Sequence, residues 1–95
     1  MDIASVRHKA LARFLETGRP VGLDANVAHR IRNMVAYLAA ADSPDELKVP
    51  PNFGFHWLTG DRRGTAAMTV TRNWRLTFRL DDDTRIVDLN LEDYH

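Results

Sequence analysis

The last three residues of this 95-residue chain, Asp93, Tyr94 and His95, place a carboxylate, a phenol and an imidazole side by side. Terminal residues are usually disordered unless a strand or helix holds them in place. Here they follow residues 85–92, in which aliphatic and polar side chains alternate as in a half-buried strand. The end of the chain is therefore expected to be docked, and a second imidazole, His56, lies in a neighbouring strand candidate.

A strand predicted over residues 74–80 adds positive charge to this set. Its aromatic and aliphatic residues alternate with Arg75, Thr77 and Arg79, so packing the apolar side chains inward turns both guanidinium groups outward. His56 alternates with aromatic neighbours in the same manner and is expected on the same open face. The cations expected to bind phosphate there are Arg62, Arg63, Arg72 and Arg79.

Imidazole, phenol and guanidinium groups are the ingredients of ribonucleolytic transesterification. A base removes the proton of the ribose 2′-hydroxyl, an acid protonates the leaving 5′-oxygen, and a cation stabilises the extra negative charge on phosphorus. Histidine titrates near neutrality and can serve in either proton transfer, whereas arginine binds phosphate oxygens in bidentate geometry.

Each of these residues also has a purely structural interpretation. A lone histidine between aromatic residues, such as His56, is more often a half-buried structural group than a catalyst. Arg75 and Arg79 are equally well explained as cross-strand partners of Asp88 or Asn90. The residues alone therefore leave the nuclease interpretation open.

Composition bounds the remaining possibilities. The chain is expected to be a single domain over residues 1–95, and it has no cysteine, which excludes a disulfide framework and a thiolate metal site. His8 and His29 lie in helical segments without the spacing of metal ligands, so no metal site is predicted. There is no apolar run of bilayer length and no secretory signal pattern, and a cytoplasmic location is expected.

The net charge of zero hides an uneven distribution. Residues 7–79 contain 12 Lys and Arg against 6 Asp and Glu, an excess of +6, whereas residues 80–95 contain 6 acids against Arg85. Blocks of opposite sign can place a basic surface beside an acidic edge. The sequence thus permits a phosphate-binding face, with ordinary solvated charge as the alternative.

Two periodicities divide the chain. Helical spacing predicts helices over residues 7–17 and 24–41. Gly18 suits the end of the first helix and Asp24 the start of the second. Ser43 with Glu46 resembles a capping box around a single helical turn. From residue 52 the period changes to two, with strands expected near residues 53–58, 67–71, 74–80 and 85–92. In the last strand, the side chains expected to face inward are Val87, Leu89 and Leu91.

Short links between these strands require sequential antiparallel pairing. The expected fold is therefore α+β, with two N-terminal helices packed on a four-stranded antiparallel sheet, and residues 3–6 are a candidate fifth strand at its edge. The helices must cover one apolar face of the sheet and leave the other face open.

Three segments together resemble one protein family. Residues 56–64 (HWLTGDRRG), 73–78 (NWRLTF) and 91–95 (LEDYH) closely resemble the HigB branch of the RelE/ParE toxin superfamily, the plasmid maintenance system killer proteins. The likeness extends to residues 7–9 (RHK) and 14–18 (FLETG), so it covers nearly the whole chain in the right order.

This resemblance implies a RelE-like fold and a toxin of a type II toxin–antitoxin pair, which enters the ribosomal A site and cleaves mRNA without a metal or other cofactor. The implied partners are a HigA-like helix-turn-helix antitoxin, the ribosome with its mRNA, and operator DNA only through the antitoxin. The residues that match the family's catalytic positions are His56, Arg75, Asp93, Tyr94 and His95.

The chain departs from the family pattern at Thr59, where relatives commonly have lysine, and in its neutral overall charge. The lost cation leaves Arg62 or Arg63 as candidates to replace it. Two rival functions remain at this stage. One is a relative that poisons DNA gyrase without cleaving RNA, and the other is a catalytically decayed toxin kept as antitoxin partner and operator co-repressor.

Overall fold

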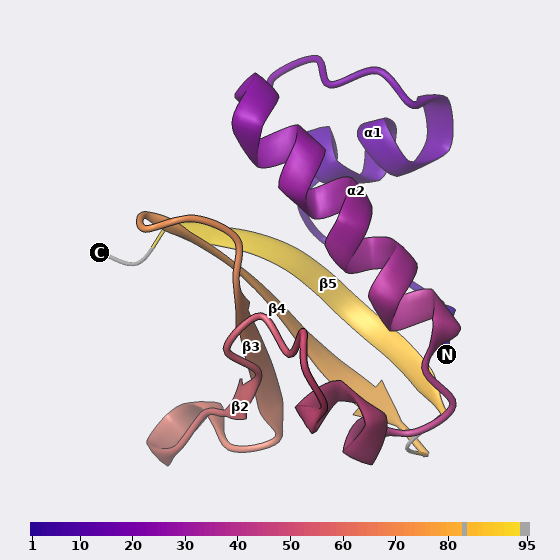
Figure 1. Ribbon diagram of the computed structural model, residues 1–95, viewed down its shortest axis with the longest axis vertical. Helices are drawn as coiled ribbons and strands as arrows, with labels where there is room; N and C mark the ends of the chain where they lie inside the picture. Colours follow the sequence, from indigo (N-terminus) through magenta and orange to yellow (C-terminus); the bar gives the residue numbers. More distant parts are fainter. Residues whose placement is uncertain (83, 94–95) are drawn as a thin grey trace.

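In the computed structural model, which describes residues 1–82 and 84–93, two helices cover one face of a five-stranded sheet (Figure 1). The strand order is β1-β5-β4-β3-β2, and β2 to β5 form an antiparallel meander. The elements in chain order are β1 (Asp2–Ile3), α1 (Lys9–Thr17), α2 (Ala25–Ala40), the 3₁₀ helix η1 (Pro44–Lys48), β2 (His56–Trp57), the 3₁₀ helix η2 (Gly60–Arg62), β3 (Thr65–Thr69), β4 (Trp74–Asp81) and β5 (Arg85–Asp93). The predicted α+β class, helix pair and meander are confirmed.

The expectation of a wholly antiparallel sheet is wrong, because β1 pairs with β5 in parallel. After β1 the chain passes through both helices and enters the sheet again at the opposite edge, at β2. The meander then returns across the sheet, and its last strand, β5, runs in the same direction as β1. Beyond β1, the backbone N–H groups of Ala4 and Arg7 donate to the carbonyl oxygens of Ile86 and Leu89, each at 2.7 Å. The N-terminal segment thereby satisfies backbone groups at the outer edge of β5.

The helices begin and end at residues whose side chains or backbone suit those positions. His8 precedes α1 and its Nδ1 accepts a hydrogen bond from the N–H of Leu11 at 3.1 Å, so α1 starts two residues later than expected. Gly18 ends α1 with a left-handed φ of 77°, and Asp24 caps α2 by accepting from two backbone N–H groups. Among the described residues, no helix is both long and apolar enough to cross a membrane.

The predicted capping box between Ser43 and Glu46 is wrong. The Ser43 side chain makes no capping hydrogen bond at the start of η1. The carboxylate of Glu46 instead accepts from the N–H of Asp42 at 2.8 Å, so the acidic side chain reaches back one residue further than a capping box requires.

Two strands differ from the simple alternation read from the sequence. Phe53 and Gly54 have φ angles of 49° and 69°, which turns the chain sharply and shortens β2 to His56 and Trp57. Asp88 has a φ of 54° and forms a bulge in β5, where the register against β4 shifts. Because the bulge inserts one residue, Ile86 is the buried residue at the start of β5, and the prediction that Val87 faces inward is wrong.

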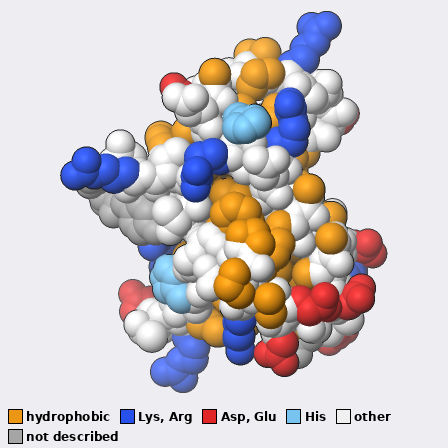
Figure 2. Space-filling model, viewed as in Figure 1, with side chains coloured by type: hydrophobic (Ala, Val, Ile, Leu, Met, Phe, Trp, Pro, Cys, Tyr) orange, Lys and Arg blue, Asp and Glu red, His pale blue; other side chains and the backbone are white. Residues whose placement is uncertain are grey.

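The core lies between the helices and the covered face of the sheet. Ile31, Met34 and Leu38 of α2 and Leu76 of β4 have no exposed surface, and Phe78 is 1% exposed. Each such side chain contributes about 1.5–3 kcal/mol through removal of apolar surface from water. Neither α1 nor α2 covers the opposite face of the sheet, since both lie on the same side of it in Figure 1. Charges are segregated on the molecule as well, since Figure 2 shows acidic side chains gathered at the lower right of the view.

Candidate active site

The strand register places polar side chains in rows across the open face of the sheet. His56 of β2 pairs with Ala67 of β3, Ala67 with Thr77 of β4, and Thr77 with Asn90 of β5. Directly opposed residues on antiparallel strands share a face. His56 therefore lies about 10 Å from Thr77, because the single strand β3 separates their strands.

The neighbouring row contains Thr69, Arg75 and Glu92, again opposed in sequence order across β3, β4 and β5. Arg75 is half-buried, with its side chain 20% exposed. The register thus confirms that His56 and Arg75 lie on the same face of the sheet, as the alternation predicted.

The imidazole of His56 is exposed to solvent, and one of its nitrogens has a fixed partner. Its Nδ1 lies 2.9 Å from the carbonyl oxygen of Gly54. A carbonyl oxygen can only accept a hydrogen bond, so Nδ1 carries the proton in the neutral ring and Nε2 keeps its lone pair. This arrangement leaves Nε2 available to act as a base on an exposed side chain of the open face.

Glu92 is the best-connected charged side chain on this face, although the strand alternation marked it only as one polar residue among several. Arg62 donates from Nη1 and Nη2 to its two carboxylate oxygens at 2.7 and 2.6 Å. The hydroxyl of Thr77 also donates to it, and Arg75 Nη2 lies 3.7 Å from Glu92 Oε1. The hydrogen bonds from Arg62, the single one from Thr77, and the charges of Arg62 and Arg75 lower the pKa of Glu92 from 4.5 to about 2.

The structural alternative for Arg75 named Asp88 or Asn90 as its cross-strand partner. The carboxylate found beside Arg75 is that of Glu92, which is opposite it in the register. An acidic residue opposite Arg75 could have been found from the strand alignment alone, once the bulge at Asp88 was known. The contribution of Arg62 could not, because it comes from the η2 segment rather than from the meander.

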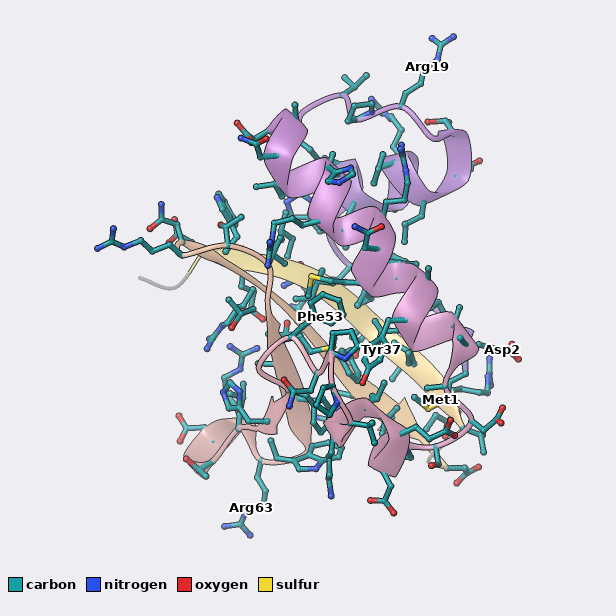
Figure 3. All side chains as sticks on the ribbon, in the orientation of Figure 1. Met1, Asp2, Arg19, Tyr37, Phe53 and Arg63 are labelled. Atoms are coloured by element: carbon teal, nitrogen blue, oxygen red, sulfur yellow. The ribbon has the colours of Figure 1, made fainter. Side chains whose placement is uncertain are left out.

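The four arginines expected to bind RNA occupy different surroundings. Arg62 is held against Glu92, whereas Arg63 is exposed and points away from the body of the molecule, as labelled in Figure 3. Arg72 is exposed in the turn between β3 and β4. Arg79 is exposed on the open face, where a Cβ added to Gly64 would lie 3.8 Å from its guanidinium. The structure therefore brings Arg62 and Arg79 to the lining of one cavity, whereas Arg63 and Arg72 are not part of that lining.

The C-terminal trio is described only at its first member. Asp93 is exposed at the end of β5 and pairs in register with Trp74, the residue before Arg75. It therefore lies at the same end of the sheet as the row of Arg75 but, like Trp74, on the face that the helices cover. Tyr94 and His95 lie outside the described residues.

A cavity of about 370 Å³ opens on this face of the sheet. Its lining combines three arginines with carboxylates, an amide and hydroxyl groups, and consists of Arg7, Asp61, Arg62, Thr65, Thr77, Phe78, Arg79, Asp88, Asn90 and Glu92. Among residues 1–82 and 84–93, no three His, Asp or Glu side chains are grouped as metal ligands. The chemistry available from the described side chains is proton transfer by imidazole or carboxylate and anion binding by guanidinium groups.

Comparison with proteins of known structure shows the same fold. The chain superimposes on the crystal structure of YafQ from E. coli strain BL21(DE3) with a TM-score of 0.52 and 14% identity, covering 88% of each chain. It also resembles the solution structure of HP0894 from Helicobacter pylori, with a TM-score of 0.50 and 16% identity over 99% of this chain and 96% of that one.

Comparison of sequences goes further. The chain is 36% identical over 93 residues to Endoribonuclease HigB of Proteus vulgaris, covering 98% of this chain and 99% of that protein. Residues 4–95 match the model of a family described as the RelE-like toxin of the type II toxin–antitoxin system HigB. The match spans both helices and the whole sheet apart from β1, so this chain belongs to the HigB-like family of RelE-like toxins.

Proposed function

We propose that this toxin is a metal-independent endoribonuclease, that it cleaves mRNA on the ribosome, and that a HigA-like helix-turn-helix antitoxin neutralises it. Its family is that of toxins from type II toxin–antitoxin systems, and the 36% identical relative from Proteus vulgaris is an endoribonuclease by name. Operator DNA would be bound only through the antitoxin.

The single observation that carries this proposal is the orientation of His56. Its Nδ1 is fixed by the carbonyl of Gly54, so the basic Nε2 is presented on the sheet face that also carries Arg75. In the reaction, the base takes the proton of a ribose 2′-hydroxyl, and the 2′-oxygen forms a bond to phosphorus as the bond to the 5′-oxygen breaks. Arg75 stabilises the negative charge that builds up on the phosphoryl oxygens.

The leaving 5′-oxygen needs a proton from an acid. We assign this step to the C-terminal trio Asp93, Tyr94 and His95, of which Asp93 ends the strand beside β4. Arg62, Arg63, Arg72 and Arg79 then bind flanking phosphates, and the exposure of the last three supports that role.

The shape of the site supports a requirement for the ribosome. The cavity of about 370 Å³ beside Glu92 can surround little more than a nucleotide, and neither His56 nor Arg75 lines it. Most of the ordering of a flexible RNA strand must therefore come from another body. Positioning of reactants can contribute several kcal/mol, up to about 7–11 kcal/mol, to lowering a barrier. The same exposed face gives an antitoxin a surface to cover without changing the fold.

The test compares purified toxin on free mRNA and on the same mRNA in a translating complex, each with and without a HigA-like antitoxin. We expect efficient cleavage only in the translating complex, and none with antitoxin present. Equal cleavage of both RNAs would refute the dependence on the ribosome. Cleavage of neither RNA would refute the nuclease, and inhibition of gyrase in its place would establish a gyrase poison.

A further inference from the structure

The carboxylate of Glu92 lies where two guanidinium groups converge on the open face. Arg62 binds it with both terminal nitrogens, at 2.7 and 2.6 Å, in the parallel two-bond geometry that arginine also uses for phosphate. Arg75 approaches the same carboxylate from the opposite strand at 3.7 Å. The side chain of Glu92 is 20% exposed, so this anion is at the surface of the cavity and within reach of a ligand.

The charges of these three side chains determine how strongly the site attracts a phosphate. The two arginines carry two positive charges and Glu92 one negative charge, because hydrogen bonds from Arg62 and Thr77 keep the pKa of Glu92 far below neutrality. These three side chains together therefore present an approaching phosphate with a charge of +1, where the two arginines alone would present +2. The phosphate also finds the two terminal nitrogens of Arg62 already donating.

We propose that Glu92 occupies the place of an RNA phosphate between Arg62 and Arg75, and that RNA must displace it before both guanidinium groups can bind the backbone. This inference rests on the proposed ribonuclease function and names how its anion site is regulated. Displacement begins at Arg75, since a separation of 3.7 Å is longer than a hydrogen bond, whereas both contacts of Arg62 are short.

The consequence is discrimination between loosely and firmly positioned RNA. A free strand gains little from a site that already holds an anion, and it remains weakly bound. An RNA strand that the ribosome already holds in one conformation loses less conformational entropy on binding, so it displaces Glu92 at a smaller cost in free energy. The alternative is that the ion pair between Glu92 and Arg62 has only a structural role and holds η2 against β5.

These two alternatives differ in what removal of the negative charge does to binding. The probe is a short 2′-O-methyl RNA, which cannot be cleaved through its 2′-oxygen, and its dissociation constant is measured over a series of salt concentrations. Glu92→Gln should bind it more tightly than the parental toxin by roughly threefold to tenfold at low salt, the value of a charge-assisted hydrogen bond at a partly exposed site. The slope of log K against log salt should steepen by about 0.7, because the variant neutralises one more RNA phosphate.

The matched control is Asp88→Asn, which removes the same charge from the lining of the same cavity. Asparagine tolerates the positive φ of Asp88, and no ion pair joins Asp88 to Arg62 or Arg75 within the described ranges. A second variant, Thr77→Val, keeps the Glu92 charge but removes one hydrogen bond that holds it, and should give a smaller increase in affinity.

Thermal unfolding establishes that each variant is folded before its binding is compared. Equal affinity for the parental toxin and Glu92→Gln would overturn the proposal, as would an equal increase in Asp88→Asn. Cleavage of mRNA in a translating complex is scored separately on the parental toxin. If that cleavage is absent while Glu92→Gln still binds the probe more tightly, the ribonuclease proposal fails. The proposal that Glu92 occupies a phosphate-binding place between Arg62 and Arg75 is then still supported.

Discussion

The Nδ1 atom of His56 lies 2.9 Å from the carbonyl oxygen of Gly54, two residues earlier in the chain. Gly54 holds this carbonyl in place from a left-handed conformation, with φ at 69°. A Cβ at this position would lie 3.1 Å from Thr69 Oγ1. Thr69 is a residue of β3 and faces the open side of the sheet, opposite Arg75. The imidazole of His56 is thus oriented by backbone that only glycine adopts without strain.

Gly54→Ala should therefore lower cleavage by more than its loss of stability explains, because the carbonyl shifts and the imidazole loses its fixed tautomer. The control is Gly18→Ala, which has a φ of 77° and no atom within 4 Å of the added Cβ. Both variants should lose about 1 kcal/mol in unfolding free energy from the left-handed backbone. Equal residual cleavage in the two variants would show that the Gly54 carbonyl does not orient His56.

His56→Ala should reduce cleavage of translated mRNA by about a hundredfold to ten-thousandfold, the usual contribution of a general base. Its melting temperature should change little, since the side chain is exposed. His29→Ala, an exposed histidine on α2, is the matched control and should retain parental activity. Retained cleavage in His56→Ala would leave His56 as a structural residue.

The comparison of Arg75→Ala with Arg75→Lys tests whether a guanidinium or only a positive charge is needed. Loss of one preorganised donor lowers the rate by about a hundredfold or more, and lysine should restore only part of it because a point charge cannot reproduce the bidentate fork. Arg85→Ala removes a guanidinium at the far end of the same sheet, where it pairs with Asp81, and should leave cleavage unchanged. A parental rate in Arg75→Ala would make Arg75 merely an ion-pair partner of Glu92.

The elements that carry local signals could be predicted from the sequence. Gly18 and Asp24 mark the helix ends by their own conformational and hydrogen-bonding preferences, and the alternation in residues 74–80 correctly assigned Arg75 to the open face. The left-handed conformations of Phe53 and Asp88 could not be predicted in this way. Non-glycine residues rarely adopt positive φ, so the sequence gives no signal for the bulge at Asp88, and simple alternation places Val87 on the wrong face.

The candidate site shows the same division. The alternation and the resemblance together identified His56 and Arg75, whose shared face is a property of strands. Glu92 was overlooked as one more polar residue of an alternating strand. Its significance depends on Arg62, which reaches it from η2 across thirty positions of sequence, and such a contact follows only from the folded chain.

The pair of Glu92 and Arg62 also predicts a dependence of stability on pH. The pKa of Glu92 is lowered to about 2 in the folded chain, so its stabilisation is complete above 4.5 and is lost as the pH falls toward 2. Glu92→Gln should cost about 1–2 kcal/mol of unfolding free energy at pH 7, allowing for solvent screening, and this difference should shrink below pH 4.5. Chemical denaturation at several pH values measures it.

The controls for this prediction are two neighbouring arginines. Arg62→Gln removes the same ion pair from its other side and should reproduce the loss at pH 7, whereas Arg63→Gln changes an exposed side chain that points outward (Figure 3) and should have little effect. A difference between parental toxin and Glu92→Gln that stays constant down to pH 2 would mean that Glu92 stabilises the fold by packing and not by charge.

Thr59→Lys places a cation just before η2, where the resemblance to the HigB branch leads us to expect lysine. Thr59 is exposed and its side chain makes no capping hydrogen bond, so the substitution should not disturb the fold. We expect faster cleavage in the translating complex and a steeper decline with salt, because an added phosphate contact increases counterion release. Ala36→Lys adds the same charge at an exposed position on α2, on the covered side of the sheet, and should change neither quantity. If the two variants behave alike, the lysine acts only through net charge, and if neither differs from the parental toxin, Arg62 or Arg63 already fills that role.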